Sequence, residues 1–152
     1  MNDVVTKPAG SASRPVDYLR EIPAIIAHMQ ALQGLIEQHG IDKKLLHLVK
    51  LRASQINRCA YCVTMHTKEA RADGETNERL DRLVVWKHVG DYSERERAAL
   101  AWTDALTGLD TEPEPAPLRG RLRLHFSDKE IGALTAAVAA INFWNRIAIA
   151  TH

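Results

Sequence analysis

The sequence predicts an all-α protein of about six to seven helices. Through most of the 152 residues, apolar residues recur at every third or fourth position, and turn signals fall about 12 to 20 residues apart. β-branched residues are scattered through these helical periods, whereas strands would show them in short alternating runs. With 45% hydrophobic and 26% charged residues, the composition is that of one globular domain. We therefore expect an N-terminal arm over Met1–Arg14 and a single helical domain over residues 15–152.

Two helices are expected in the first part of this domain. A helical stripe runs from about Val16 to Gln38, and Pro23 is expected to divide it. Asp42 is a typical N-cap for the next helix, which extends to about Asn57. One face of that helix is apolar. The other face carries His47 among lysines and a serine, and periodicity alone predicts that this face is solvated.

The middle of the chain contains three further helical segments and a connector. A third helix is expected over Ala60–Ala72, and a fourth from Thr76 to His88. Ser93–Glu96 is a capping box that opens a fifth. Thr111–Leu118 holds three prolines and should form an extended connector. The count of helices depends on whether the segment Leu118–His125 forms a short helix.

The last helix is apolar on nearly every side. A second capping box, Ser127–Glu130, opens it, and it continues from Ile131 to about Ala150. A helix with this pattern is buried within its own domain or against another subunit. The apolar surface exceeds what one small domain covers, so we expect a homo-oligomer.

Charge and hydropathy exclude several classes of partner. The formal net charge is +1, and no cluster of basic residues coincides with an aromatic platform, so we expect no nucleic-acid partner. No stretch reaches 18 uncharged apolar residues, and the N-terminal segment lacks the apolar core of a signal peptide. We therefore expect no membrane partner and a cytoplasmic location.

Both cysteines and a histidine lie together at C-x-x-C-x-x-x-H spacing, as Cys59, Cys62 and His66. Asn57-Arg58 interrupts the preceding apolar pattern, which places Cys59 at a helix start, where unpaired amides and the helix dipole favour a thiolate. At roughly 100° per residue, the three side chains fall within an arc of about 60°. Thiol, thiol and base can then share one pocket.

The same spacing has other readings. Two cysteines three positions apart are typical of a redox dithiol in a reducing compartment, but also of a metal site, or they are buried and inert. Tyr61 and Met65 project away from the cysteine arc and are expected in the core or in an interface. His47, twelve residues before Cys59, is expected on a solvated face.

The stretch from Leu46 to Gly74 resembles the AhpD-like alkylhydroperoxidase core of the carboxymuconolactone decarboxylase superfamily, and the likeness extends over Leu83–Leu106 and Ala140–Ala148. The resemblance implies an all-helical fold that assembles as trimers or hexamers. It also implies a peroxidase cycle. In this cycle Cys62 attacks a hydroperoxide, Cys59 resolves the sulfenic acid as a disulfide, and His66 belongs to a proton relay. An unknown thiol or protein reductant recharges the dithiol, and we expect no cofactor and no metal.

The sequence departs from the family pattern at three positions. His47 stands where the family's relay usually has a glutamate, Tyr61 stands where the best-studied members have a histidine, and Arg58 replaces a glycine. A neutral imidazole holds His66 less well than a carboxylate, so we expect a slow reaction that His47→Glu accelerates. Two alternatives remain: a Cys₂His₂ metal site formed by the two cysteines with His47 and His66, and an oligomer with little peroxidase activity.

Overall fold

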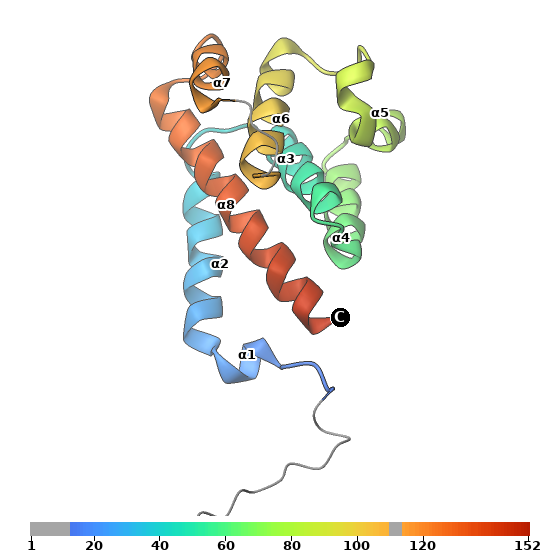
Figure 1. Cartoon of the computed structure of the whole chain (residues 1–152), viewed down its shortest axis with the longest axis vertical. Coiled ribbons are helices and arrows are strands. Elements are labelled where there is room, and N and C mark those ends of the chain that lie inside the picture. The colour runs from blue at the N-terminus through green and yellow to red at the C-terminus, as the bar shows by residue number, and fades with distance from the viewer. Residues whose placement is uncertain (1–12, 110–113) are drawn as a thin grey trace, which may run out of the picture.

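The computed structural model describes residues 13–109 and 114–152. The arm expected over Met1–Arg14 therefore lies almost entirely outside the described residues. Within them, every regular element is a helix: eight α-helices and one 3-10 helix (Figure 1). The all-α prediction is confirmed.

The first half of the fold follows the turn signals in the sequence. Pro23 separates α1 (Tyr18–Glu21) from α2 (Pro23–Glu37) and occupies the first position of α2, where a missing N–H has no consequence. The side chain of Asp42 accepts a hydrogen bond from the Leu45 amide and so caps α3 (Lys43–Ile56).

The helices around the centre of the chain begin at capping residues. Cys59 is the N-cap of α4 (Ala60–Ala72). Thr76 caps α5 (Asn77–Arg82), which passes directly into the 3-10 helix η2 (Leu83–His88), so the expected fourth helix changes its winding midway. Ser93 and Glu96 form both hydrogen bonds of the capping box that opens α6 (Glu94–Thr107).

The prediction of an extended connector over Thr111–Leu118 was wrong in its second half. Residues 110–113 lie outside the described part of the chain, but α7 (Pro115–Leu122) begins at Pro115. Prolines are tolerated in the first helical turn, because the amides there have no carbonyl partner within the helix. The last helix, α8 (Asp128–Thr151), opens at the predicted capping box of Ser127 and Glu130.

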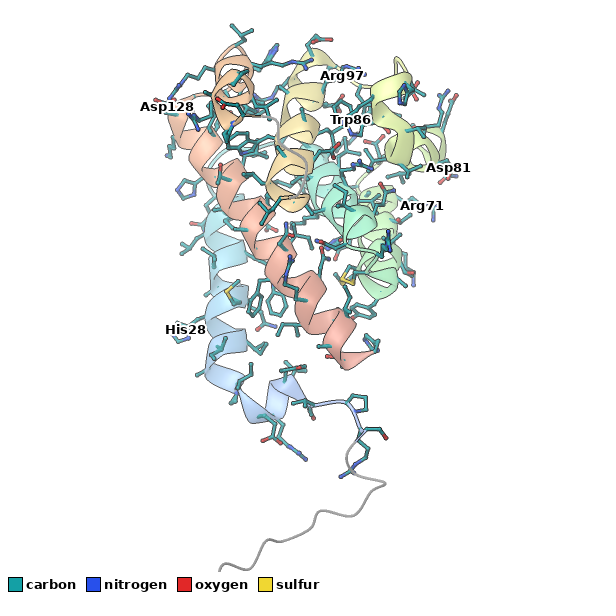
Figure 2. All side chains as sticks on the ribbon, in the orientation of Figure 1. His28, Arg71, Asp81, Trp86, Arg97 and Asp128 are labelled. Carbon is teal, nitrogen blue, oxygen red and sulfur yellow. A yellow bond between two sulfur atoms is a disulfide. The ribbon has the colours of Figure 1, made fainter. Side chains whose placement is uncertain are left out.

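The helix α8 is the longest helix among the described residues and organises the packing. It contacts α2, α3, α4 and α6, and α3 in turn contacts α4 and α6 (Figure 1). By length and composition alone α8 could cross a membrane, and it is the one such helix among residues 13–109 and 114–152. In this structure 39% of its most apolar 18-residue stretch is buried inside the protein. Figure 2 shows the side chains that fill the space between α8 and the helices around it.

Two groups of buried residues lie on either side of α3. One joins α2, α3, α6, α7 and α8 and includes Trp102 and Phe126; the other joins α3, α4, α5, η2 and α6 and includes Trp86 and Leu83. The middle of α3 takes part in both and is fixed by them. The turn after its C-terminal end leads to Cys59, and Cys62 follows in the first turn of α4.

Candidate active site

The turn between α3 and α4 places Cys59 at a helix N-terminus. The Cys59 amide donates to the Ser54 carbonyl at 3.0 Å, and the Arg58 amide donates to the Gln55 carbonyl at 3.1 Å. This pair of bonds is a Schellman ending of α3, which needs a left-handed residue at its centre. Arg58 supplies it with φ of 57°. The backbone conformation explains why a glycine is usual at this position in the resembling family.

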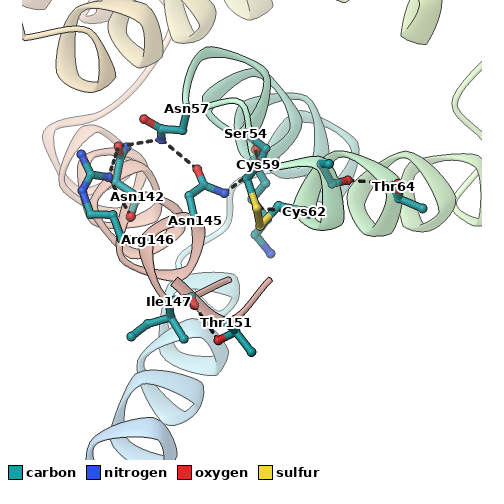
Figure 3. Close-up of a disulfide and its surroundings, with 12 residues drawn as sticks. Ser54, Asn57, Cys59, Cys62, Thr64, Asn142, Asn145, Arg146, Ile147 and Thr151 are labelled. Atoms are coloured by element: carbon teal, nitrogen blue, oxygen red, sulfur yellow. Dashed lines mark hydrogen bonds between the residues drawn. A yellow bond between two sulfur atoms is a disulfide. The ribbon is translucent and has the colours of Figure 1, made fainter. Parts of the chain in front are cut away.

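A chain of side-chain amides fixes this turn to α8 (Figure 3). The Asn57 amide donates to the side-chain oxygens of Asn142 at 3.0 Å and Asn145 at 2.8 Å. The fully buried Asn145 then donates to the Ser54 hydroxyl at 2.9 Å. Buried amides with all partners in place hold one geometry, because breaking any bond leaves an unpaired polar group. The cysteines are thus positioned by α8 as well as by their own helix.

Cys59 and Cys62 form a disulfide within the chain, with their Cα atoms 5.3 Å apart. The Cys59 sulfur also accepts a hydrogen bond from the Cys62 amide at 3.3 Å, which is the N-cap contact of α4. Both side chains are buried, at 1% and 2% exposure. The disulfide that the resemblance implies is present.

Cys62 lines an apolar cavity of about 530 Å³ between α4, α8 and the N-terminal segment, and Cys59 is not among its lining residues. Tyr61 and Met65 line the same cavity, and neither is a buried core residue, so of the two expected places the core was wrong and an interface stays a prediction. The cavity spans more of the surface of α4 than the narrow cysteine arc. The ring of Tyr61 stacks on that of His152 at a centroid distance of 5.0 Å, which brings the C-terminal residue to the cavity.

His66 lies one helical turn after Cys62 and is buried at 3% exposure. Its Nδ1 lies 2.8 Å from the Glu69 carboxylate, and its Nε2 is buried without a hydrogen-bond partner among the described residues. Burial lowers the pKa of His66, and the hydrogen bond to Glu69 opposes this shift. The imidazole is therefore neutral at neutral pH.

The position of His47 corrects the sequence-based expectation. It is buried at 6% exposure, not solvated, because the α4 C-terminus covers this face of α3. Its Nε2 lies 2.5 Å from Asp73, and its Nδ1 lies 3.9 Å from the Glu69 carboxylate. The two histidines from the sequence prediction thus meet around carboxylates that the prediction missed. The spacing His66, Glu69, Asp73, at three and four residues, was the signal that could have found them.

These titratable groups line a second, polar hollow of about 640 Å³. Gln30 and Gln33 of α2 line both this hollow and the apolar cavity, so the two lie next to each other along α2. Within the described part of the chain, no three histidine, cysteine or carboxylate side chains are arranged to hold a metal ion. In this disulfide form the Cys₂His₂ set is divided, since the sulfurs bond each other and each histidine faces a carboxylate.

Comparison with known proteins places the chain in a family. The model of the carboxymuconolactone decarboxylase family matches residues 23–105. The uncharacterized protein YdfG of Bacillus subtilis is 35% identical over 138 residues, which cover 91% of this chain and 94% of that protein. The uncharacterized protein YnjA of Escherichia coli is 25% identical over 135 residues, covering 88% and 74% of the two chains.

Solved structures agree with this assignment. ATU0492 of Agrobacterium tumefaciens is a protein of unknown function whose name proposes it as the antioxidant defence protein AhpD. It superposes with a TM-score of 0.84 at 41% identity, over 90% of this chain and 93% of that one. The debrominase Bmp8 in complex with 2,3,4-tribromopyrrole shares the fold at a TM-score of 0.77 and 19% identity, over 88% and 71% of the two chains. This chain belongs to the carboxymuconolactone decarboxylase family, in its AhpD-like branch.

Proposed function

We propose that the protein is a thiol-dependent peroxidase that reduces hydroperoxides through a Cys59–Cys62 dithiol–disulfide cycle. The observation that carries the proposal is the position of Cys62: it is bonded to Cys59, lines a cavity and precedes a buried histidine by one turn. A dithiol that only stabilised the fold would need neither a cavity at one sulfur nor a buried histidine with an unpaired nitrogen one helical turn further along the helix. The described structure is then the oxidised end of the cycle.

In the first step the Cys62 thiolate attacks one oxygen of the hydroperoxide. A sulfur–oxygen bond forms, the oxygen–oxygen bond breaks, and the alcohol leaves with a proton while Cys62 becomes a sulfenic acid. His66 is the proton carrier in this step, because its unpaired Nε2 can take the thiol proton and return it to the departing alkoxide. The N-terminus of α4 favours the thiolate.

In the second step the Cys59 thiol attacks the sulfenic sulfur of Cys62. The disulfide forms and water leaves, so two electrons have passed from the dithiol to the peroxide. The roles follow from access, since Cys62 lines the cavity and Cys59 lies behind it as the N-cap of α4. A thiol or protein reductant restores the dithiol.

The cavity indicates the kind of peroxide. Side chains such as Ile26, Met65, Trp144 and Ile147 make the space around Cys62 apolar, which favours an organic hydroperoxide over hydrogen peroxide. We also propose that the protein works in the cytoplasm as a homo-oligomer, with no nucleic acid or membrane as partner.

Trapping of the sulfenic acid tests the proposal. Reduced Cys59→Ser should consume one equivalent of cumene hydroperoxide and become labelled by a dimedone-type probe at Cys62. Reduced Cys62→Ser should do neither, although it keeps one thiol. The native dithiol should convert one hydroperoxide to alcohol per chain and lose both thiols. Equal labelling of the two variants would mean that the roles of Cys59 and Cys62 are wrongly assigned. If the native protein consumed no hydroperoxide, the proposed function would be refuted.

A further inference from the structure

One carboxylate stands between the two buried histidines. Glu69 follows His66 by three residues on α4, and its carboxylate lies 2.8 Å from His66 Nδ1 and 3.9 Å from His47 Nδ1. Asp73, one turn further on, lies 2.5 Å from His47 Nε2 and 3.0 Å from the Lys43 ammonium. The side chains alternate imidazole and carboxylate across the polar hollow.

The contact with Glu69 determines how His66 presents its two nitrogens. A carboxylate accepts, so Nδ1 of the neutral ring carries the hydrogen that points to Glu69. The other nitrogen, Nε2, is then the lone-pair acceptor, and it is buried without a partner. A carboxylate in this position fixes the ring and stabilises the imidazolium that forms when the ring takes a proton.

His47 is held by Asp73 and not by Glu69. Its Nε2 lies 2.5 Å from Asp73, the C-cap residue of α4, whereas its Nδ1 lies 3.9 Å from Glu69 and is buried without a hydrogen-bond partner among the described residues. His47 and then Lys43 hold the pKa of Asp73 below its usual range, so this carboxylate stays charged. An imidazole at position 47 therefore does not leave the site without a carboxylate.

We propose that Glu69 is the positioning residue for His66, taking the part that a glutamate at position 47 plays in the family pattern. The inference rests on the proposed function for its role in catalysis. The electrostatic effect of Glu69 on the Cys62 thiol does not depend on peroxidase activity and can be measured separately.

Other charges around the hollow act on the same proton. From α3, Lys50 and His47 disfavour a charge on His66, and burial does so more strongly; on its own helix Glu69 favours it. Glu37 of α2 lies 3.4 Å from Lys50 and also lines the hollow, and Lys43 is engaged with Asp73. Glu69 is thus the group that favours a protonated His66 against burial, Lys50 and His47.

The test uses the Cys59→Ser background, in which Cys62 is the single thiol. The pKa of Cys62 is read from the pH dependence of its alkylation by iodoacetamide. Adding Glu69→Gln should raise this pKa by about one unit and slow alkylation at pH 7 by up to about tenfold, because the thiolate loses its stabilised imidazolium partner. Glu69→Asp should give a smaller shift. The matched control is Glu37→Gln, which removes a carboxylate from the same hollow that contacts Lys50 and not His66, and should shift the pKa much less than Glu69→Gln.

Rescue separates electrostatics from a merely structural effect. Adding His47→Glu to Glu69→Gln returns a carboxylate to the other side of His66 and should recover at least half of the shift. An unchanged Cys62 pKa in Glu69→Gln, or an equal shift in Glu37→Gln, would overturn the inference, as would a failed rescue in a folded double variant. Since alkylation needs no peroxide, native protein that is inert to hydroperoxide would refute the proposed function while the effect of Glu69 on the thiol still stood.

Discussion

The Glu69 carboxylate lies 2.8 Å from His66 Nδ1, within the same helix and on the side of the imidazole that belongs to the polar hollow. This contact alters the expectation for His47. The resemblance predicted that His47→Glu would accelerate the reaction, and a carboxylate acting alone on His66 would be expected to give roughly tenfold, or about 1.4 kcal/mol of barrier. With Glu69 already in place, we predict less than about a threefold gain from the single substitution, because two carboxylates near one imidazole repel each other.

Rates of hydroperoxide reduction by reduced native protein and by His47→Glu, measured in rapid mixing at pH 7, check this prediction. His47→Ala serves as the control for loss of the imidazole itself. A tenfold acceleration in His47→Glu would mean that Glu69 does not fill the relay position.

The pH dependence of the reaction follows from the buried state of His66. Burial lowers its pKa below the ordinary value of about 6.5, so the folded protein binds the proton less readily than the unfolded chain. The acid limb of kcat/KM for hydroperoxide should therefore lie below pH 6.5. The burial of neutral His66 also affects the free energy of unfolding. Its contribution is fully present above pH 6.5 and is lost as the pH falls through the lower pKa of the folded state.

A pH profile of kcat/KM together with urea unfolding at pH 7.5 and pH 5.5 measures both effects. His66→Gln, which does not titrate, should reduce the loss of stability on acidification. An acid limb above pH 7 would contradict a neutral, buried His66.

Arg58 should weaken the fold through its backbone and not through its charge. With φ of 57°, it occupies the left-handed region, which costs a residue with a Cβ roughly 1 kcal/mol. Arg58→Gly should therefore raise the free energy of unfolding by up to about 1 kcal/mol, after the greater entropy of glycine in the unfolded chain is counted. The exposed guanidinium of Arg58 is removed equally by Arg58→Ala, which keeps the strained backbone. Urea unfolding of both variants separates the two effects, and equal stabilisation by alanine would assign the cost to charge.

Assembly is predicted to involve α2 more than α8. The sequence placed the expected interface on the apolar last helix, but Ile141 of α8 is buried within the subunit. Large apolar side chains are exposed on α2 instead, at Ile25 and Leu35. Leu35→Glu should convert an oligomer at micromolar concentration into smaller species without loss of helical signal, whereas Ile141→Glu should unfold the chain. Light scattering and circular dichroism distinguish these outcomes, and a monomeric native protein would refute the prediction.

Local signals in the sequence were sufficient for most of the helix boundaries. The capping boxes at Ser93 and Ser127 and the N-cap at Asp42 were confirmed, because each is decided by hydrogen bonds within four residues. The start of α7 at Pro115 was missed, since a proline can either prevent a helix from continuing or occupy the first turn of a new one.

The site was only partly predictable for a different reason. Cys59, Cys62 and His66 lie within two helical turns, so their closeness along the chain follows from periodicity alone. The expectation that they share one pocket was wrong, because Cys62 lines the apolar cavity, His66 lines the polar hollow and Cys59 lines neither. The burial of His47 depends on how α4 packs over α3, which no local pattern specifies. Glu69 is 45% exposed at its side chain and resembles any solvated helix carboxylate until the ring of His66 is placed against it.

The central claim is that hydroperoxide closes the Cys59–Cys62 disulfide within one subunit. Reduced protein, freed of reductant and treated with one equivalent of cumene hydroperoxide per chain, should lose about 2 Da in intact mass under non-reducing conditions. Its peptide map should show Cys59 joined to Cys62 in the same chain, as their Cα separation of 5.3 Å allows. An unchanged mass with both thiols free, or disulfides that join two subunits, would contradict the account.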